Sequence, residues 1–252
     1  MPQPPTPLVR KGHEIAIAGE FFDIGTKVIL WNDPGGLSGY DHSNFAERDS
    51  VTQAPWDLKR VREAIDQFVI HYDGSGSSAD CFRVLNDRGL SVHFMLDTDG
   101  TIYQMLDVKE RAWHATKANS RSVGVEIANV GAFPVDQSER LEQWYQSHSV
   151  EPMLQEAVVG EIQGQKLRMY DLTARQYEAL IKLTAGLCRA LPRIACTYPR
   201  SNAILTDSEF EAFHGVLGHY HIQLDKIDPG PAFQWDRVID GARAILRTKS
   251  TN

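Results

Sequence analysis

The sequence predicts one α/β domain with a central mixed β-sheet flanked by helices. Segments with strand character and amphipathic helical segments intermix along the chain. They do not follow the strict βαβ repeat of an all-parallel sheet, so both parallel and antiparallel strand pairs are expected. A composition of 42% hydrophobic and 23% charged residues is ordinary for a chain with a substantial core.

The first 55 residues predict an N-terminal extension of unclear structure. Residues 1–8 are rich in proline and predict a disordered or strapping arm. Residues 27–31 are the one convincing strand of this part, and a loop dense in Gly, Asp and Ser follows them. The domain itself is expected over residues 56–248.

Within this domain the elements alternate irregularly. Helices are expected over 57–66, from Ser78 to the C-cap Gly89, over 137–147, over 173–191 with Thr173 as N-cap, over 208–214 and over 233–247. Strands are expected over 67–72, on either side of the hairpin signal Asp99-Gly100, over 122–129 and over 216–219. Residues 150–170 are weakly patterned and predict an insertion.

Charge and composition limit the partners. The formal charge is −7 and no window is strongly basic, which argues against a nucleic-acid partner. No run of 18 apolar residues exists, so no membrane insertion is expected. The N-terminus lacks the apolar core of a signal peptide, which predicts a cytoplasmic protein as synthesised. The three cysteines have no CxxC spacing and do not predict a disulfide framework or a cysteine zinc site.

Two polar residues on predicted strands are candidates for a role in chemistry. His71 is the penultimate residue of strand 67–72 and precedes a Gly/Ser loop, a common place for site residues. Glu126 shares a strand face with Gly124 and Ala128, which leave room beside its carboxylate. A glutamate there is costly unless paired or used, so a general base with a raised pKa is one interpretation. A core histidine and the exposed face of an edge strand are the alternatives.

The segment HYHIQLDKIDPG, residues 219–230, offers ligands for a metal. Hydrolytic zinc sites use three His or carboxylate ligands and leave a fourth position open. One ligand set takes His219 and His221 as an HxH pair on a strand. The other takes His219 and Asp228 together with His71. Spacing alone does not choose between them.

Four motifs in order carry a resemblance to a known family: VIHYDGSG, SVHFMLDTDGTIYQML, RAWHATKANSRSVGVEIAN and GHYHIQLDKIDPGPAFQW. Together they resemble the zinc-dependent N-acetylmuramoyl-L-alanine amidases. This family includes phage lysozyme-type amidases, anhydromuramyl-peptide amidases and peptidoglycan recognition proteins. The match spans residues 65–240, apart from the 150–170 insertion.

The resemblance implies that Zn²⁺ is held by His71, His219 and Asp228, and it demotes His221 to loop structure. The family's ligand loop is often one residue longer than the loop here. Non-catalytic recognition proteins lose the third ligand, so the presence of Asp228 favours an enzyme over a pure binder.

Further roles follow from the same resemblance. Glu126 matches the general base of the anhydromuramyl-amidase branch. The phage branch uses a tyrosine just before the first hairpin histidine, and that position is Val92 here. Lys226 matches a lysine that stabilises the transition state. His114 and Asn119 match positions that line the substrate groove.

The implied activity is hydrolysis of the amide between N-acetylmuramic acid and L-alanine, with peptidoglycan or muropeptides as substrate. Residues 56–248 would form the zinc amidase domain. Its site of action would be the cytoplasm, or the cell wall if the protein is exported or released. A non-catalytic peptidoglycan-binding module, a zinc amidohydrolase for another amide and a structural protein with incidental histidines are the alternatives. The sequence does not indicate an oligomeric state.

Overall fold

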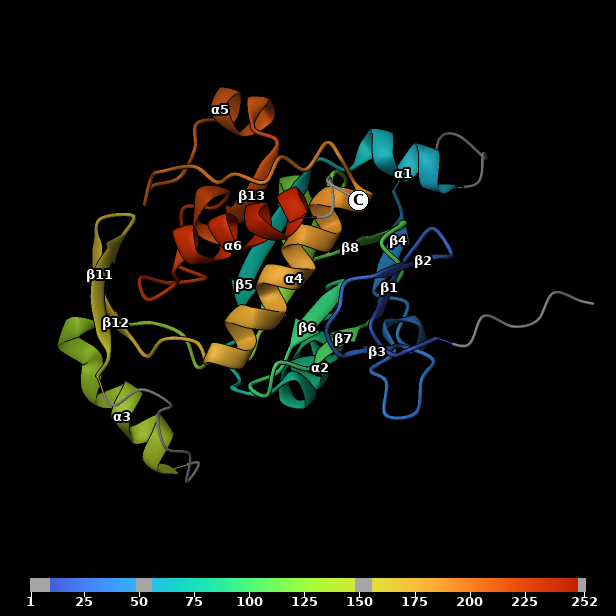
Figure 1. Ribbon diagram of the computed structural model, residues 1–252. Helices are drawn as coiled ribbons and strands as arrows, with labels where there is room; N and C mark the ends of the chain where they lie inside the picture. Colours follow the sequence, from blue (N-terminus) through green and yellow to red (C-terminus); the bar gives the residue numbers. More distant parts are fainter. Residues whose placement is uncertain (1–9, 49–55, 148–155, 249–252) are drawn as a thin grey trace, which may run out of the picture.

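The fold was obtained as a computed structural model, which describes residues 10–48, 56–147 and 156–248 (Figure 1). Residues 1–8, the expected arm, lie outside this description. At the centre is a six-stranded sheet with the order β13-β5-β9-β6-β7-β3. All neighbouring pairs in it are parallel except β6–β7, so the predicted mixed sheet is confirmed.

The helices occur where the sequence predicts them. They are α1 (Leu58–Ala64), α2 (Ser78–Asp87), α3 (Ser138–Ser147), α4 (Ala174–Ala190), α5 (Asp207–Ala212) and α6 (Trp235–Thr248). Thr173 caps α4 as predicted, since its hydroxyl accepts the Gln176 N–H and the Gln176 side chain accepts the Thr173 N–H in return. Among the described residues no helix is both long and apolar enough to span a bilayer.

The strands of the main sheet are β3 (Val28–Leu30), β5 (Gln67–Tyr72), β6 (Phe94–Leu96), β7 (Ile102–Gln104), β9 (Ser122–Ile127) and β13 (Gly215–Gly218). Smaller sheets contain β1 (Glu14–Ile17), β2 (Glu20–Asp23), β4 (Phe45–Glu47), β8 (Glu110–Ala112), β10 (Phe133–Pro134), β11 (Val158–Ile162) and β12 (Gln165–Met169). Strands β6 and β7 form the hairpin that Asp99-Gly100 predicts.

Period two gives the central strands two different faces. Phe68 and Ile70 of β5 point into the main core, where they pack with Val125 of β9 and with the apolar stripes of α4 and α6. Figure 1 shows these two helices together over one face of the sheet. Helix α2 packs against the other face, through a cluster that includes Cys81 and Met95. His71 and Glu126 lie on this second face.

Residues 10–48 are integrated into the fold. Strand β3 pairs in parallel with β7 and extends the main sheet, and β4 pairs with β8. The sequence predicts β3 but not β1, β2 or β4, which are four residues long or shorter. In the segment predicted as an insertion, β11 and β12 form an antiparallel hairpin whose second strand pairs with β10.

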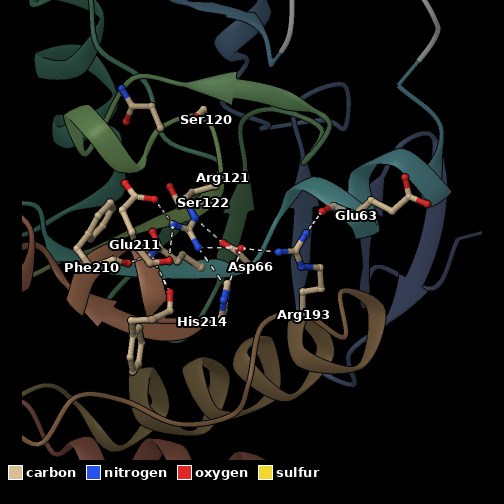
Figure 2. A network of polar contacts seen from close by, with 12 residues as sticks. Glu63, Asp66, Ser120, Arg121, Ser122, Arg193, Phe210, Glu211 and His214 are labelled. Atoms are coloured by element: carbon tan, nitrogen blue, oxygen red, sulfur yellow. Dashed lines mark hydrogen bonds and ion pairs between the residues drawn. The ribbon is translucent and has the colours of Figure 1, made fainter. Parts of the chain in front are cut away.

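A buried carboxylate joins the amino ends of three parallel strands (Figure 2). Asp66, Arg121 and His214 directly precede β5, β9 and β13 respectively. Arg121 donates Nε–H and a terminal N–H to the two Asp66 oxygens, at 2.7 and 2.9 Å. The same carboxylate lies 2.9 Å from His214 Nδ1 and 3.2 Å from Arg193. The opposite ends of the same strands carry the candidate site.

Candidate metal centre

Three donor atoms converge at the carboxyl ends of β5 and β13. His71 is the fifth residue of β5, and His219 directly follows β13. His71 Nδ1 lies 3.1 Å from His219 Nδ1 and 2.8 Å from Asp228 Oδ2, and the last two atoms are 3.2 Å apart. In the described part of the chain, these residues form the one group of three or more His, Cys, Asp or Glu that meets the geometry of a metal site.

The donor set fits a tetrahedral Zn²⁺. With Zn–N and Zn–O bonds of about 2.1 Å, tetrahedral geometry separates the ligand atoms by about 3.4 Å, somewhat more than the 2.8–3.2 Å found here. Burial and the neighbouring His219 lower the pKa of His71, so its ring is neutral and offers a lone pair. Burial alone would raise the pKa of Asp228, but His219 and His71 outweigh it and keep the carboxyl ionised.

A second histidine fixes the orientation of the His71 ring. His71 Nε2 lies 3.0 Å from His114 Nδ1, and His114 Nε2 lies 3.2 Å from the Ser122 hydroxyl. A His71 ring with its Nδ1 lone pair free carries a proton on Nε2, which it donates to His114. The space beside Gly124 is filled by His114, since a Cβ there would lie 2.6 Å from its ring. The room that the sequence predicts beside Glu126 is thus partly occupied by the protein.

The two histidines of the HxH pair point to different partners. His219 and His221 lie in a 3-10 turn and not on a strand, so residues two apart do not share a face. His221 accepts the Gly218 N–H at Nδ1 and donates Nε2–H to the Ser201 carbonyl, both at 2.9 Å. Both of its nitrogens are therefore occupied away from His71. His219 instead has its Nε2 2.8 Å from the Gln223 amide oxygen.

Glu126 lies beside His71 because the two residues are partners in the parallel β5–β9 register. Its Oε2 is buried and has no hydrogen-bond partner among the described residues. Burial, then the charges of Asp228 and Asp73, raise its pKa well above the ordinary value. Strand β9 is internal to the sheet, so the exposed face of an edge strand does not explain this glutamate.

The seven residues to which the resemblance assigns a role line one pocket of about 360 Å³: His71, His114, Asn119, Glu126, His219, Lys226 and Asp228. Arg88, Trp113 and Gln223 line the same pocket. Lys226 Nζ approaches the Asp225 carboxylate at 4.0 Å. Asn119 uses its amide oxygen inside the protein, where it accepts the N–H groups of His114 and Ala115 at 3.1 and 2.7 Å. These two hydrogen bonds hold the segment that carries His114 in place.

A buried arginine supports this segment from behind, and sequence patterns do not predict it. Arg48 follows β4 and is 6% exposed. It donates to the carbonyl oxygens of Val108, Asn119, Ser120 and Ser122. His93 is fully buried beside it and accepts the Gly124 N–H. No local sequence pattern predicts that Arg48 is buried, because an isolated arginine is usually exposed.

The fold and the site define an α/β protein with a buried His, His, Asp donor set, of the kind that three-ligand metal sites use, beside a carboxylate of raised pKa. Residues 61–231 match the family of N-acetylmuramoyl-L-alanine amidases. The chain therefore belongs to this family, as the resemblance of its motifs predicts. A search among curated proteins gave no match.

Several solved structures are similar to this chain. A selenomethionine derivative of AmpD is 18% identical, with a TM-score of 0.43, over 79% of this chain and 90% of that one. AmiD from E. coli, in complex with anhydro-N-acetylmuramic acid-L-Ala-D-γ-Glu-L-Lys, is 18% identical with a TM-score of 0.47, over 91% of this chain and 65% of that one. The amidase endolysin LysCS from Clostridium intestinale is 15% identical with a TM-score of 0.44, over 88% of this chain and 95% of that one.

Proposed function

We propose that this protein is a zinc-dependent N-acetylmuramoyl-L-alanine amidase acting on peptidoglycan or muropeptides. One observation carries the proposal: three buried donor atoms within 3.2 Å of one another line a single pocket with Glu126, whose Oε2 is buried without a hydrogen-bond partner among the described residues. Family membership supports the class of amide bond. A binding module would need neither the complete donor set nor a carboxylate oxygen that is buried without a partner, which is costly to maintain.

The metal would be held by His71 Nδ1, His219 Nδ1 and Asp228 Oδ2. When bound, Zn²⁺ supplies a Lewis acid that polarises the scissile carbonyl and makes water acidic enough to be deprotonated near neutral pH. His114 keeps the proton of His71 on Nε2, which leaves Nδ1 directed at the centre.

The protein's own residues would move the proton and hold the developing charge. Glu126 accepts a proton from the attacking water and returns it to the nitrogen of the leaving L-alanine. Its raised pKa brings it closer to neutrality, where a group can both accept and donate a proton. Lys226 lines the same pocket and would hold the negative charge on the former carbonyl oxygen, a contribution of about 3 kcal/mol by comparison with other oxyanion donors.

Hydrolysis of sacculi and of anhydro-muropeptides, with and without a chelator, tests the proposal. The expected result is release of the stem peptide with a free L-alanine amine, detected by mass spectrometry, and its loss on chelation. Glu126→Ala is expected to keep zinc and lose hydrolysis. Glu178→Ala is the matched control, because Glu178 is an exposed glutamate of α4. Full activity of Glu126→Ala at unchanged zinc content would contradict the role of Glu126. Binding of muropeptide without cleavage by the zinc-loaded protein would favour a binding module.

A further inference from the structure

The β11–β12 hairpin lies against the loop that carries two of the three donors. We use the name metal loop for residues 219–231, which begin at His219 and include Lys226 and Asp228. Figure 1 shows the hairpin at the left edge of the view, near α3. Its sequence is the weakly patterned segment predicted as an insertion, and the proposed reaction assigns it no task.

Apolar side chains join the two segments. Ile162 and Leu167 of the hairpin form one buried cluster with Tyr220 of the metal loop, and Ile227 packs against the same cluster. Tyr220 directly follows His219, and Ile227 stands between Lys226 and Asp228. The hairpin therefore packs beside both donors of the loop.

Close backbone approaches mark the end of the metal loop. A Cβ at Gly160 of β11 would lie 2.7 Å from the Pro231 Cβ. A Cβ at Gly230 would lie 2.4 Å from the Met169 sulfur of β12. The rigid ring of Pro231 leaves no space for a side chain at Gly160, whereas the flexible Met169 side chain would have to move to admit one at Gly230.

The turn of the hairpin makes the polar contacts. The Gln163 side-chain N–H₂ donates to the carbonyl oxygens of Tyr220 at 2.6 Å and Gln223 at 2.7 Å. Gln163 has φ of +50°, a conformation that Gly and Asn adopt far more readily than other residues. Its backbone N–H is also used, since it donates to Asn202. A glutamine at this position thus brings a side chain that the backbone conformation does not favour.

We infer that Gln163 is a positioning residue for the metal centre, an inference that rests on the proposed function. Two contacts transmit its effect. Tyr220 is the neighbour of His219, so its carbonyl fixes the backbone from which that donor projects. Gln223, the second acceptor, has its amide oxygen 2.8 Å from His219 Nε2, and its carbonyl also accepts the Lys226 N–H. Gln163 therefore restrains both the donor His219 and the backbone that presents Lys226.

Gln163→Asn tests the inference. Asn tolerates the positive φ, but it is one methylene shorter and does not span the distance to the two carbonyls. The zinc dissociation constant, measured by competition with a chromophoric chelator, is expected to rise about tenfold, the lower range for loss of an outer-shell partner. Hydrolysis is expected to lose kcat at unchanged KM. The unfolding midpoint of the metal-free protein is expected to change little, because the backbone strain that Asn relieves offsets the two part-buried hydrogen bonds that it loses.

Two further variants make the result decisive. Gln165→Asn is the matched control, since Gln165 lies two residues away in the same hairpin and is exposed; its zinc affinity is expected to equal that of the wild type. Gln163→Glu keeps the length but replaces the N–H donors by a carboxylate, and it is expected to weaken zinc at least as much as Gln163→Asn.

Equal zinc affinities for Gln163→Asn, Gln163→Glu and Gln165→Asn would overturn the inference. A loss of affinity matched in both Gln163 variants by a lower unfolding midpoint of the metal-free protein would also overturn it, by assigning Gln163 a merely structural role. Failure of the wild type to bind zinc would instead contradict the proposed metal centre. The wild-type measurement thus separates the two proposals.

Discussion

Replacing Asp66 by Asn tests whether the buried node at the amino ends of β5, β9 and β13 stabilises the fold. The Asp66 side chain is 4% exposed, and that of its bidentate partner Arg121 is 16% exposed. Removal of one partner from such a buried pair costs about 3–5 kcal/mol. The second carboxylate partner of Arg121, Glu211, is 70% exposed, so solvent screens its compensation of the Arg121 charge. Asn retains one acceptor oxygen for Arg121, and one hydrogen bond to a charged group returns about 1–2 kcal/mol.

The other contacts of Asp66 contribute less. The side chains of Arg193 and His214 are nearly half exposed, at 49% and 44%, so solvent screens their contacts with the carboxylate. Each pair is worth about 0–1 kcal/mol. The sum for Asp66→Asn is a loss of about 3 kcal/mol in the free energy of unfolding. In a chain of this size that corresponds to a fall of roughly 6–12 °C in the unfolding midpoint.

Asp207→Asn is the matched control for this substitution. Asp207 contacts Lys117 at 2.7 Å, the same distance as the shorter Asp66–Arg121 bond, but its side chain is 94% exposed. Urea and thermal unfolding followed by circular dichroism are expected to show no resolvable change for Asp207→Asn. If both variants lost the same stability, burial would not decide the strength of these ion pairs. A small loss of stability, equal in both variants, would contradict the expected loss of about 3 kcal/mol for Asp66→Asn.

Three other predictions concern the site. His71→Ala is expected to lose both zinc and hydrolysis. His221→Gln is expected to keep one zinc per chain but to lose about 1–2 kcal/mol of stability, because its two buried hydrogen bonds are lost. Metal analysis and unfolding measurements check both variants, and loss of zinc in His221→Gln would restore the HxH ligand set. Burial raises the pKa of Asp73 from 3.8 to about 7, so the folded metal-free protein holds a proton that the unfolded chain has released. The contribution of Asp73 to the unfolding free energy should therefore fall as pH rises from about 4 to about 7. Buried histidines such as His71 and His114, whose pKa values are lowered, act with the opposite sign. Asp73→Asn should therefore make the unfolding free energy rise more steeply, or fall less, with pH in this range, and an unchanged slope would contradict the shift. Hydrolysis at saturating substrate should rise with pH across the raised pKa of Glu126, and a rate independent of pH from 4 to 8 would argue against a carboxylate base.

The central sheet could be predicted because its signals are local, whereas the donor set is implied only by the resemblance of the motifs to a family. Strand alternation places His71 and Glu126 on one face, and the motif order pairs them with His219 and Asp228. The supporting residues could not be predicted in this way. Arg48 and Gln163 act on carbonyl groups at least 57 residues away in the chain, and a carbonyl carries no information about residue type. Their contacts follow from tertiary packing and leave no periodicity or spacing to detect.

His114 shows a different limit. The motif predicts that His114 lines a substrate groove. In the structure His114 lines the pocket, but both of its ring nitrogens contact protein groups, His71 and Ser122. Only the packing of the ring over Gly124 reveals this arrangement. Patterns of residue type thus locate a site more readily than they distinguish the groups that face a substrate from those that hold the site together.

The position of β3 at the edge of the main sheet has a consequence for how the chain can be divided. The family match begins at residue 61, yet β3 lies before it and pairs with β7. A fragment cut at this boundary would leave the hydrogen-bonding groups of Ile102–Gln104 unpaired along an open strand, the kind of surface on which chains associate with one another. It would also remove the buried guanidinium of Arg48. The evolutionary boundary of the family and the physical boundary of the folded unit therefore fall at different residues.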